Sequence, residues 1–336
     1  MRRTSTGDRR QARLSSGAPP GLERLEGGID EAGFGPLLGP LCIGFAALEG
    51  PADPWTALSD AVSRRPIHRL PAVCDSKVLY PGEGGLARLE RSALLFLSLA
   101  RGSRPRTIRD VLDGPFPPAR ETLDRHPWYR DLEIPLPRSV PVETLEADLD
   151  RAREACDRAG LRVREAGVRA IPEGEFNAGV TRSGNKADFH VGLVAEVLAH
   201  LATLPRRGEG RILVDRLGGR RFYGEPLASL LPEFLPTPLR EGPSRSEYLL
   251  HGAAAGARLS FCVGGERLSF ACALGSVLAK YARELLVERL NAFFLDRLPG
   301  LRPTAGYYED GRRFLEEIRR RLDPGQVPVD LLVRVR

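Results

Sequence analysis

Two adjacent carboxylates, Asp30 and Glu31, stand where an apolar run of the chain meets a glycine-rich turn. The sequence around them, residues 27–40, reads GGIDEAGFGPLLGP, and a second apolar segment follows it. Consecutive residues of a strand point to opposite faces, so both acids cannot enter one core. At the end of a strand, both can turn toward one divalent ion, while the glycines let another backbone approach closely. The alternative interpretation is a hairpin with a solvated acidic corner.

Four more motifs follow this one along the chain. They are CDSKVL at 74–79, RILVD at 211–215, SFCVGGE at 260–266 and ALGSVLAKY at 273–281. In type and order, the five motifs resemble those of the type 2 ribonucleases H, the family of ribonucleases HII and HIII. The first strand of that family carries Gly-x-Asp-Glu-Ala-Gly-x-Gly-Pro-x-x-Gly-Pro, and residues 28–40 keep every fixed position. The resemblance covers most of residues 27–310, with a long unmatched middle, and implies a ribonuclease H-like fold.

The resemblance also implies a site of four acids at or just after strand ends: Asp30, Glu31, Asp215 and Glu266. Phosphodiester hydrolysis needs an activated water, neutralised phosphoryl charge and support for the leaving oxygen. Two Mg²⁺ or Mn²⁺ ions about 3.5–4 Å apart supply all three, and such hard cations prefer carboxylate oxygens. By resemblance, Asp30 would bridge both ions, and the other three acids would complete their coordination.

The fourth acid departs from the pattern of ribonuclease HII, which usually has Asp where this chain has Glu266, whereas the HIII branch has Glu. The lysine that often stands two residues earlier is Gly264 here. Glu284 is a competing candidate for the fourth acid, for which we favour a solvated or structural role.

Substrate contacts are also implied by resemblance. In the family, the Gly-x-Gly turn, here Gly33 and Gly35, presents backbone groups to the ribose 2′-OH, which separates RNA from DNA. The middle residue is commonly Arg in HII and is Phe34 here. Gly306-Tyr307 resembles the HII element whose tyrosine packs on the sugar beside the scissile ribonucleotide. An amphipathic tyrosine at a loop–helix junction is the alternative for Tyr307.

Lysine is rare in this chain, which suggests that the positions that hold lysine have a function that arginine would not fulfil. Of 50 Lys and Arg residues only three are Lys, namely Lys77, Lys186 and Lys280. A compact ammonium suits contact with a phosphate, and we expect all three, together with Ser76, to contact substrate phosphates or support the acids. Chance retention is the alternative.

Composition predicts a cytoplasmic protein, and its net charge alone does not predict a polyanionic partner. The net charge is +6, but residues 1–20 carry five arginines against one aspartate, or +4, which leaves about +2 for the rest. Any footprint for nucleic acid must therefore come from local clustering. No apolar window is long enough for a membrane span, and we expect neither a signal peptide nor a membrane association. Five scattered cysteines without Cys-x-x-Cys spacing fit reduced thiols.

The order of elements predicts an α/β fold with a mixed central sheet flanked by helices. We expect a flexible basic tail over residues 1–26 and one ribonuclease H-like domain over 27–336. Residues 101–141, rich in Pro and charge, are interpreted as an insertion without its own core. Helices are expected over 86–100, 142–160, 187–201 and about 312–322, and 161–176 as a strand pair or an edge. A further strand is expected to end at Glu266 and to be followed by a helix that runs through about 294. His190 and His200 are interpreted as structural or exposed.

These features predict a divalent-metal-dependent endonuclease that hydrolyses the RNA strand of RNA–DNA hybrids. Incision at single ribonucleotides in duplex DNA, as in ribonucleotide removal around DNA replication, is a second expected activity. The resemblance implies 5′-phosphate and 3′-hydroxyl products, and no obligate protein partner is evident. One alternative is a hybrid-binding protein that has lost turnover, and another is a structure-specific DNA nuclease on the same fold. Four intact acids argue against a pure binder, because unpaired buried carboxylates are costly.

Overall fold

A mixed β-sheet forms the centre of the computed structural model, which describes residues 24–51, 53–204, 210–252, 256–323 and 327–335. Within these residues seven strands pair in the order β3-β2-β1-β4-β7-β6-β5. The strands are β1 (Arg24–Ala32), β2 (Leu41–Gly50), β3 (Arg162–Ile171), β4 (Gly210–Asp215), β5 (Phe234–Arg240), β6 (Arg245–Gly252) and β7 (Gly256–Cys262). The central strands β1, β4 and β7 run parallel, and all other neighbours pair antiparallel. The expected α/β fold with a mixed sheet is confirmed.

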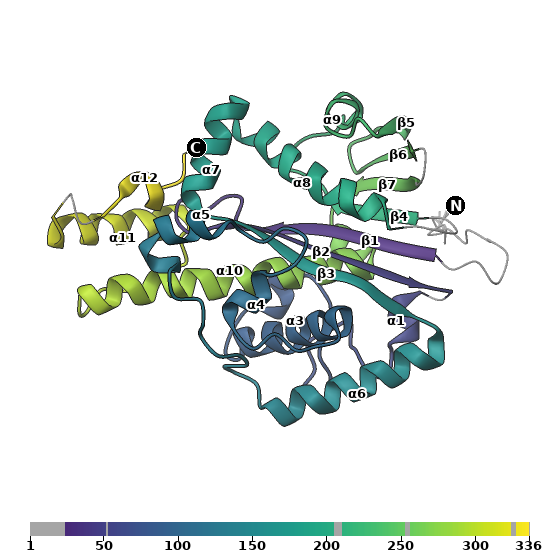
Figure 1. The fold of residues 1–336 in the computed structure, drawn as a ribbon, viewed down its shortest axis with the longest axis horizontal. Coiled ribbons are helices and arrows are strands. Elements are labelled where there is room, and N and C mark those ends of the chain that lie inside the picture. Colours follow the sequence, from purple (N-terminus) through teal and green to yellow (C-terminus); the bar gives the residue numbers. More distant parts are fainter. Residues whose placement is uncertain (1–23, 52, 205–209, 253–255, 324–326, 336) are drawn as a thin grey trace, which may run out of the picture.

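Helices cover both faces of this sheet. They are α1 (Pro54–Ala57), α2 (Ser76–Leu79), α3 (Gly85–Arg101), α4 (Ile108–Leu112), α5 (Arg120–Arg125), α6 (Val142–Ala159), α7 (Glu173–Ser183), α8 (Lys186–Ala202), α9 (Gly224–Leu230), α10 (Phe270–Arg297), α11 (Tyr308–Arg321) and α12 (Val329–Leu332), with the 3₁₀ turns η1 (Pro127–Tyr129) and η2 (Gly265–Arg267). Figure 1 shows α8 on one side of the sheet and α3, α6 and α10 on the other. Strand β2 is buried along its whole length because both of its faces are covered. Its side chains alternate between the two apolar clusters, with Ile43 in one and Cys42 in the other.

The long helix α10 lies directly on the backbones of β1 and β2. A Cβ added at Gly28 would lie 2.0 Å from the Cys272 nitrogen, and one added at Gly44 would lie 2.0 Å from the Gly275 carbonyl oxygen. Only glycine permits so close an approach. Since Ser276 follows Gly275, this contact carries the Ser276 hydroxyl to the end of β1, where the predicted acids begin.

The predicted insertion, residues 101–141, packs onto the main body. It contains α4, α5 and η1, and its side chains Trp128 and Tyr129 are buried in the same apolar cluster as α3 and α10. The segment has no core of its own, because its short helices each contribute a few buried side chains to a shared core.

Several predicted boundaries need correction. Strand β1 begins at Arg24, inside the expected tail of residues 1–26, because Leu25 already packs in the core; residues 1–23 lie outside the described part. The strand expected to end at Glu266 ends at Cys262, where the glycine pair 264–265 turns the chain into η2. Helix α11 begins at Tyr308, four residues earlier than expected. The segment 161–176 provides one edge strand, β3, followed directly by α7.

Two global properties complete the description. Within the described residues, no helix is long and apolar enough to cross a membrane. The five cysteines are free thiols, and all but Cys74 are buried, where they act as small core residues.

Candidate active site

The four predicted acids lie at or just beyond the same end of the central strands. Ile29 of β1 pairs with Val214 of β4 in parallel register, so that Asp30 and Asp215 follow at the carboxyl ends of adjacent strands. Asp215 in turn pairs with Cys262 at the end of β7, and Glu266 follows four residues later in η2. Crevices at the carboxyl ends of parallel strands are common ligand sites in α/β proteins.

A hydrogen bond ties the turn that carries the fourth acid, Glu266, to the third acid, Asp215. The Gly265 amide donates to Asp215 Oδ1 at 2.9 Å, which fixes the turn that carries Glu266 against β4. Gly265 has no room for a side chain, since an added Cβ would lie 2.6 Å from Leu213 Cδ2. Exposed Arg267 approaches Glu266, with Nε 3.8 Å from the carboxylate. The glycine pair therefore both ends β7 and positions the last acid.

Burial and mutual repulsion make ionisation of Asp30, Glu31 and Glu266 costly. Asp30 is 9% exposed, and burial, followed by the charge of Asp215, raises its pKa to about 7. Burial and then the charges of Asp30 and Asp215 raise the pKa of Glu31 well above its ordinary value. The pKa of Glu266 is also raised, first by burial and further by Asp215. Clustered acids with raised pKa values mark a candidate functional site.

The donor set suits a hard divalent cation. All four side chains offer carboxylate oxygens, the ligands that Mg²⁺ and Mn²⁺ prefer, and a cation would offset the repulsion between their charges. Among the described residues, however, no three His, Cys, Asp or Glu side chains form a group that could hold a metal ion. The fit therefore rests on donor chemistry and on the shared strand edge.

Serine side chains support the first acid from α10 and α2. Asp30 Oδ1 accepts from the Glu31 amide at 2.8 Å, and a Ser276 side-chain hydrogen bond also favours its ionised form. The Ser276 and Ser76 hydroxyls are also hydrogen-bonded to each other, with 2.9 Å between their oxygens. Ser76 therefore contacts Ser276, whose hydroxyl in turn contacts the Asp30 carboxylate.

Lys77 lies next to these acids. The Asp75 carboxylate caps α2 by accepting from the Lys77 amide at 2.9 Å, which fixes where the lysine side chain begins. Although burial acts in the opposite direction, the charges of Asp75, Asp30 and other acids raise the pKa of Lys77. Its ammonium is thus a cation close enough to Asp30, Asp215 and Glu266 for their charges to act on it.

The predicted glycine turn leaves β1 toward α8. Gly33 has a φ of +92°, which favours glycine. Phe34 stacks on the His190 ring with 4.4 Å between centroids, and Lys186 Nζ lies 4.5 Å from the centre of the Phe34 ring. An added Cβ at Gly35 would meet no atom within 4 Å, so this side of the turn is open.

The proximity of His190 to the acids was missed by the sequence analysis. Its ring is 1% exposed, and Nε2 lies 3.9 Å from Glu31 Oε2. Burial lowers its pKa to about 4, so the imidazole is neutral at pH 7. The exposed interpretation was wrong for His190; the available signal was its spacing of four from Lys186, which places both on one face of a helix. His200, in contrast, is half-buried and contacts Glu165 at 3.1 Å.

Lys280 and Glu284 form a separate cluster one turn beyond Ser276. Lys280 Nζ donates to Glu284 Oε1 at 2.6 Å and lies 4.2 Å from the centre of the Tyr80 ring. The Tyr80 hydroxyl donates to Glu284 Oε2 at 2.8 Å. Glu284 is therefore occupied by protein partners, in line with the structural role favoured for it, and Lys280 is bound in the same cluster.

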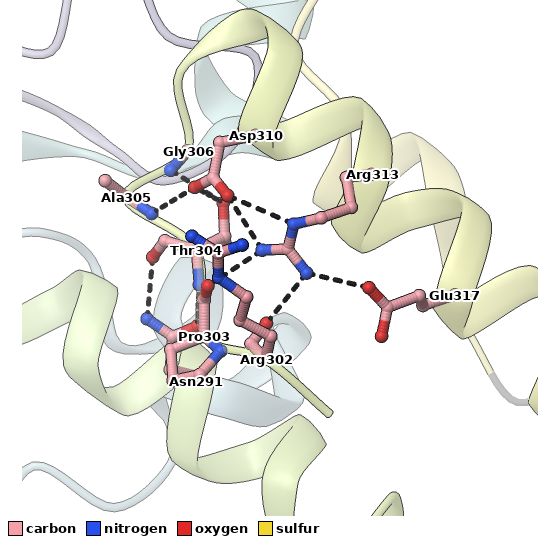
Figure 2. Close-up of polar contacts among 9 residues, drawn as sticks. All are labelled: Asn291, Arg302, Pro303, Thr304, Ala305, Gly306, Asp310, Arg313 and Glu317. Carbon is pink, nitrogen blue, oxygen red and sulfur yellow. Dashed lines mark hydrogen bonds and ion pairs between the residues drawn. The ribbon is translucent and has the colours of Figure 1, made fainter. Parts of the chain in front are cut away.

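Tyr307 is brought to the glycine turn by its own segment. The Gly306 carbonyl accepts from the Leu37 and Leu38 amides at 2.8 and 3.1 Å, and the Tyr307 ring is 53% exposed. Figure 2 shows the polar network that shapes this segment, in which Asp310 accepts from the Thr304 hydroxyl at 2.7 Å and the Ala305 amide at 2.8 Å. Arg313 and Asn291 extend the network to α11 and α10. The exposed ring is thus presented by a rigid loop.

The chain was compared with protein-family models, curated protein sequences and solved structures. No protein-family model and no curated protein sequence matches the chain. Among solved structures, ribonuclease HII in its PCNA complex from Archaeoglobus fulgidus is 15% identical, with 93% of this chain and 94% of that chain covered and a TM-score of 0.42. Ribonuclease H2 from Pyrococcus horikoshii OT3 is 15% identical, with 92% of each chain covered and a TM-score of 0.40. Bst ribonuclease HIII in complex with Mn²⁺ is 13% identical, with 94% of this chain and 66% of that chain covered and a TM-score of 0.39. By their names, these three solved structures are a ribonuclease HII, a ribonuclease H2 and a ribonuclease HIII.

Proposed function

We propose that this protein is a divalent-metal-dependent endonuclease that hydrolyses the RNA strand of RNA–DNA hybrids. Incision at single ribonucleotides within duplex DNA is a second substrate class of the same site. The observation that carries the proposal is the convergence of Asp30, Asp215 and Glu266 at the carboxyl ends of β1, β4 and β7. Four mutually repelling carboxylates at an open strand edge are costly for folding and suit a site that takes up cations.

Asp30, Glu31, Asp215 and Glu266 would hold Mg²⁺ or Mn²⁺. When bound there, a pair of such ions activates water, neutralises the phosphoryl charge and supports the leaving oxygen. Asp30 would be one of their ligands. Ser276 and the Glu31 amide hold its carboxylate in place. The products would carry 5′-phosphate and 3′-hydroxyl ends.

Other residues would bind the substrate and orient it. The open glycine turn would contact the ribose 2′-OH through its backbone, which selects RNA over DNA. The exposed ring of Tyr307 would pack on the neighbouring sugar. Lys77 and Lys186 would contact phosphates, since both ammonium groups lie beside the acids or the turn. Lys280 would act mainly through its pairing with Glu284.

The test is cleavage of four labelled duplexes in Mg²⁺ and in Mn²⁺. They are a full RNA–DNA hybrid, a DNA duplex with one ribonucleotide, its all-DNA control and a branched all-DNA duplex. We expect cutting of the hybrid, and cutting at the lone ribonucleotide would assign the second substrate class. Tight hybrid binding without cutting in either metal would contradict the proposal and favour a binding protein. Cutting of all-DNA substrates would instead favour a structure-specific DNA nuclease.

A further inference from the structure

The end of the described chain lies against the glycine turn of the candidate site. Its segment 328–335 is fastened to α7 through Asn177, whose amide nitrogen donates to the Asp330 and Val333 carbonyls at 2.9 and 2.8 Å. The Val335 amide donates back to Asn177 Oδ1 at 2.8 Å. One asparagine thus fixes the segment on both sides of Arg334.

Arg334 holds the turn at three points. Its backbone amide donates to the Leu37 carbonyl at 3.0 Å, and its Nη2 donates to the Phe34 carbonyl at 3.1 Å. Its Nη1 donates to the Gly33 carbonyl. The guanidinium is 2% exposed and lies 3.8 Å from the centre of the Phe176 ring. A buried, planar guanidinium with two donors on neighbouring carbonyls fixes their direction more closely than a single-point cation would.

The turn is also supported from beneath by groups from distant parts of the chain. Glu173 Oε1 accepts from the Gly39 amide and from the Tyr129 hydroxyl, each at 3.1 Å. The Arg283 side chain fills the space beside Gly33, where an added Cβ would lie 2.5 Å from Nε. The turn is therefore held from the interior, and its outer side at Gly35 stays open.

The direction of the two carbonyls decides what the outer side offers. In a trans peptide, the carbonyl of one residue and the amide of the next point in opposite directions. Because the Gly33 and Phe34 carbonyls point to Arg334, the Phe34 and Gly35 amides point away from it. Among the described residues, neither amide donates to a protein acceptor. Two successive outward amides form a concave donor pair that suits an oxygen acceptor.

We propose that Arg334 is a positioning residue that aims the Phe34 and Gly35 amides at an oxygen acceptor on the substrate sugar–phosphate backbone. This inference rests on the proposed function for the identity of that acceptor. It assigns a role in substrate recognition to the segment 328–335, which the sequence analysis did not connect with the site. Misplacement of such donors by about 1 Å lowers rates by up to about 100-fold.

The first measurement is amide hydrogen exchange over residues 32–40 in full-length Arg334→Met and Asn177→Leu. Each change should raise exchange there, since one removes the two side-chain donors and the other releases the segment that carries them. Arg91→Met is the matched control, because Arg91 donates to the His68 and Arg69 carbonyls and pairs with Asp148. It should raise exchange near its own loop and leave residues 32–40 unchanged. Unchanged exchange at 32–40 in both test variants would overturn the inference.

The second measurement is cleavage of the hybrid and of the single-ribonucleotide duplex by the same variants. Arg334→Met should lower kcat/KM at least 10-fold and leave the Mn²⁺ affinity within twofold of the wild type. Arg334→Lys keeps one donor and should recover part of the loss, which a merely structural role would not predict. An activity loss no larger than that of Arg91→Met at equal loss of Tm would overturn the inference. A wild-type chain that cuts no duplex would refute the proposed function, whereas the exchange result would still decide the placement of the turn.

Discussion

Glu173→Gln should stabilise the protein at alkaline pH and leave its stability unchanged at acidic pH. The side chain is fully buried, and burial, only partly offset by hydrogen bonds and by the charge of Arg334, raises its pKa from 4.5 to about 7. Between these two pH values the folded chain holds a proton that the unfolded chain has released. The free energy of unfolding therefore falls as pH rises through this window. The loss amounts to about 3 kcal/mol once the carboxyl is ionised.

The geometry explains why glutamine can replace this acid. Both of its hydrogen bonds, from the Gly39 amide and the Tyr129 hydroxyl, go to Oε1, and Oε2 has no partner. Glutamine keeps the accepting oxygen and resembles the protonated acid, so the variant should match the wild type near pH 4.5. At pH 8.5 it should be more stable by about 3 kcal/mol, which corresponds to the ionisation cost that it avoids.

Urea unfolding of both proteins at pH 4.5 and pH 8.5 without added metal measures this difference. Glu90→Gln is a control of opposite sign, because both oxygens of Glu90 accept, from the Arg138, Ser139 and Val140 amides and the Tyr281 hydroxyl. An amide there loses acceptors and should cost about 1–3 kcal/mol per unsatisfied group. A Glu173→Gln variant that is less stable than the wild type at pH 8.5, or equally shifted at both pH values, would refute the reasoning.

Three further predictions concern the site and the N-terminus. Asp30→Asn should abolish cleavage and leave hybrid binding largely intact, as measured by single-turnover cleavage beside fluorescence anisotropy; full activity would remove Asp30 from the site. Glu266→Gln should cost at least 100-fold in kcat, whereas Glu284→Gln, which changes a side chain paired with Lys280, should cost under 10-fold; the reverse order would exchange their roles. Deletion of residues 1–20 removes a net charge of +4 and should weaken hybrid binding chiefly at low salt. An equal loss at all salt concentrations would indicate a specific contact.

Local patterns were sufficient to predict the strands and helices that carry the acids. The apolar run before Asp30 and the stripe of α8 follow the strand and helix periods directly, and the structure has them where they were expected. The end of β7 was placed four residues too late, although the glycine pair 264–265 was visible. A glycine ends a strand only where its backbone leaves the extended conformation, and the sequence does not show where that happens. In the structure, Gly264 adopts a φ of +70°.

The support of the glycine turn could not be predicted from one sequence. Arg334, Glu173 and Tyr129 come from segments that no local period connects, and each looks like an ordinary surface or helix-end residue when taken alone. Their association depends on how β1, α7 and the end of the described chain pack in three dimensions. His190 belongs to the same class, since its place beside Glu31 follows from the packing of α8 over β1.

The buried charged residues under the glycine turn have protein partners, whereas the acids at the strand ends have few. Beneath the glycine turn, Glu173 and the buried arginines satisfy backbone groups and hold the chain in place. At the strand edge, within the part of the chain that the structure describes, no arginine forms an ion pair with Asp30, Glu31 or Asp215. An arginine there would offset the repulsion among their charges and stabilise the fold, but it would occupy the oxygens that a metal ion would need. Neutral contacts position these acids instead, namely Ser276 for Asp30 and the Gly265 amide for Asp215. The repulsion among the acids is thereby retained in the folded chain, and under the proposed function a bound cation would relieve it without displacing them.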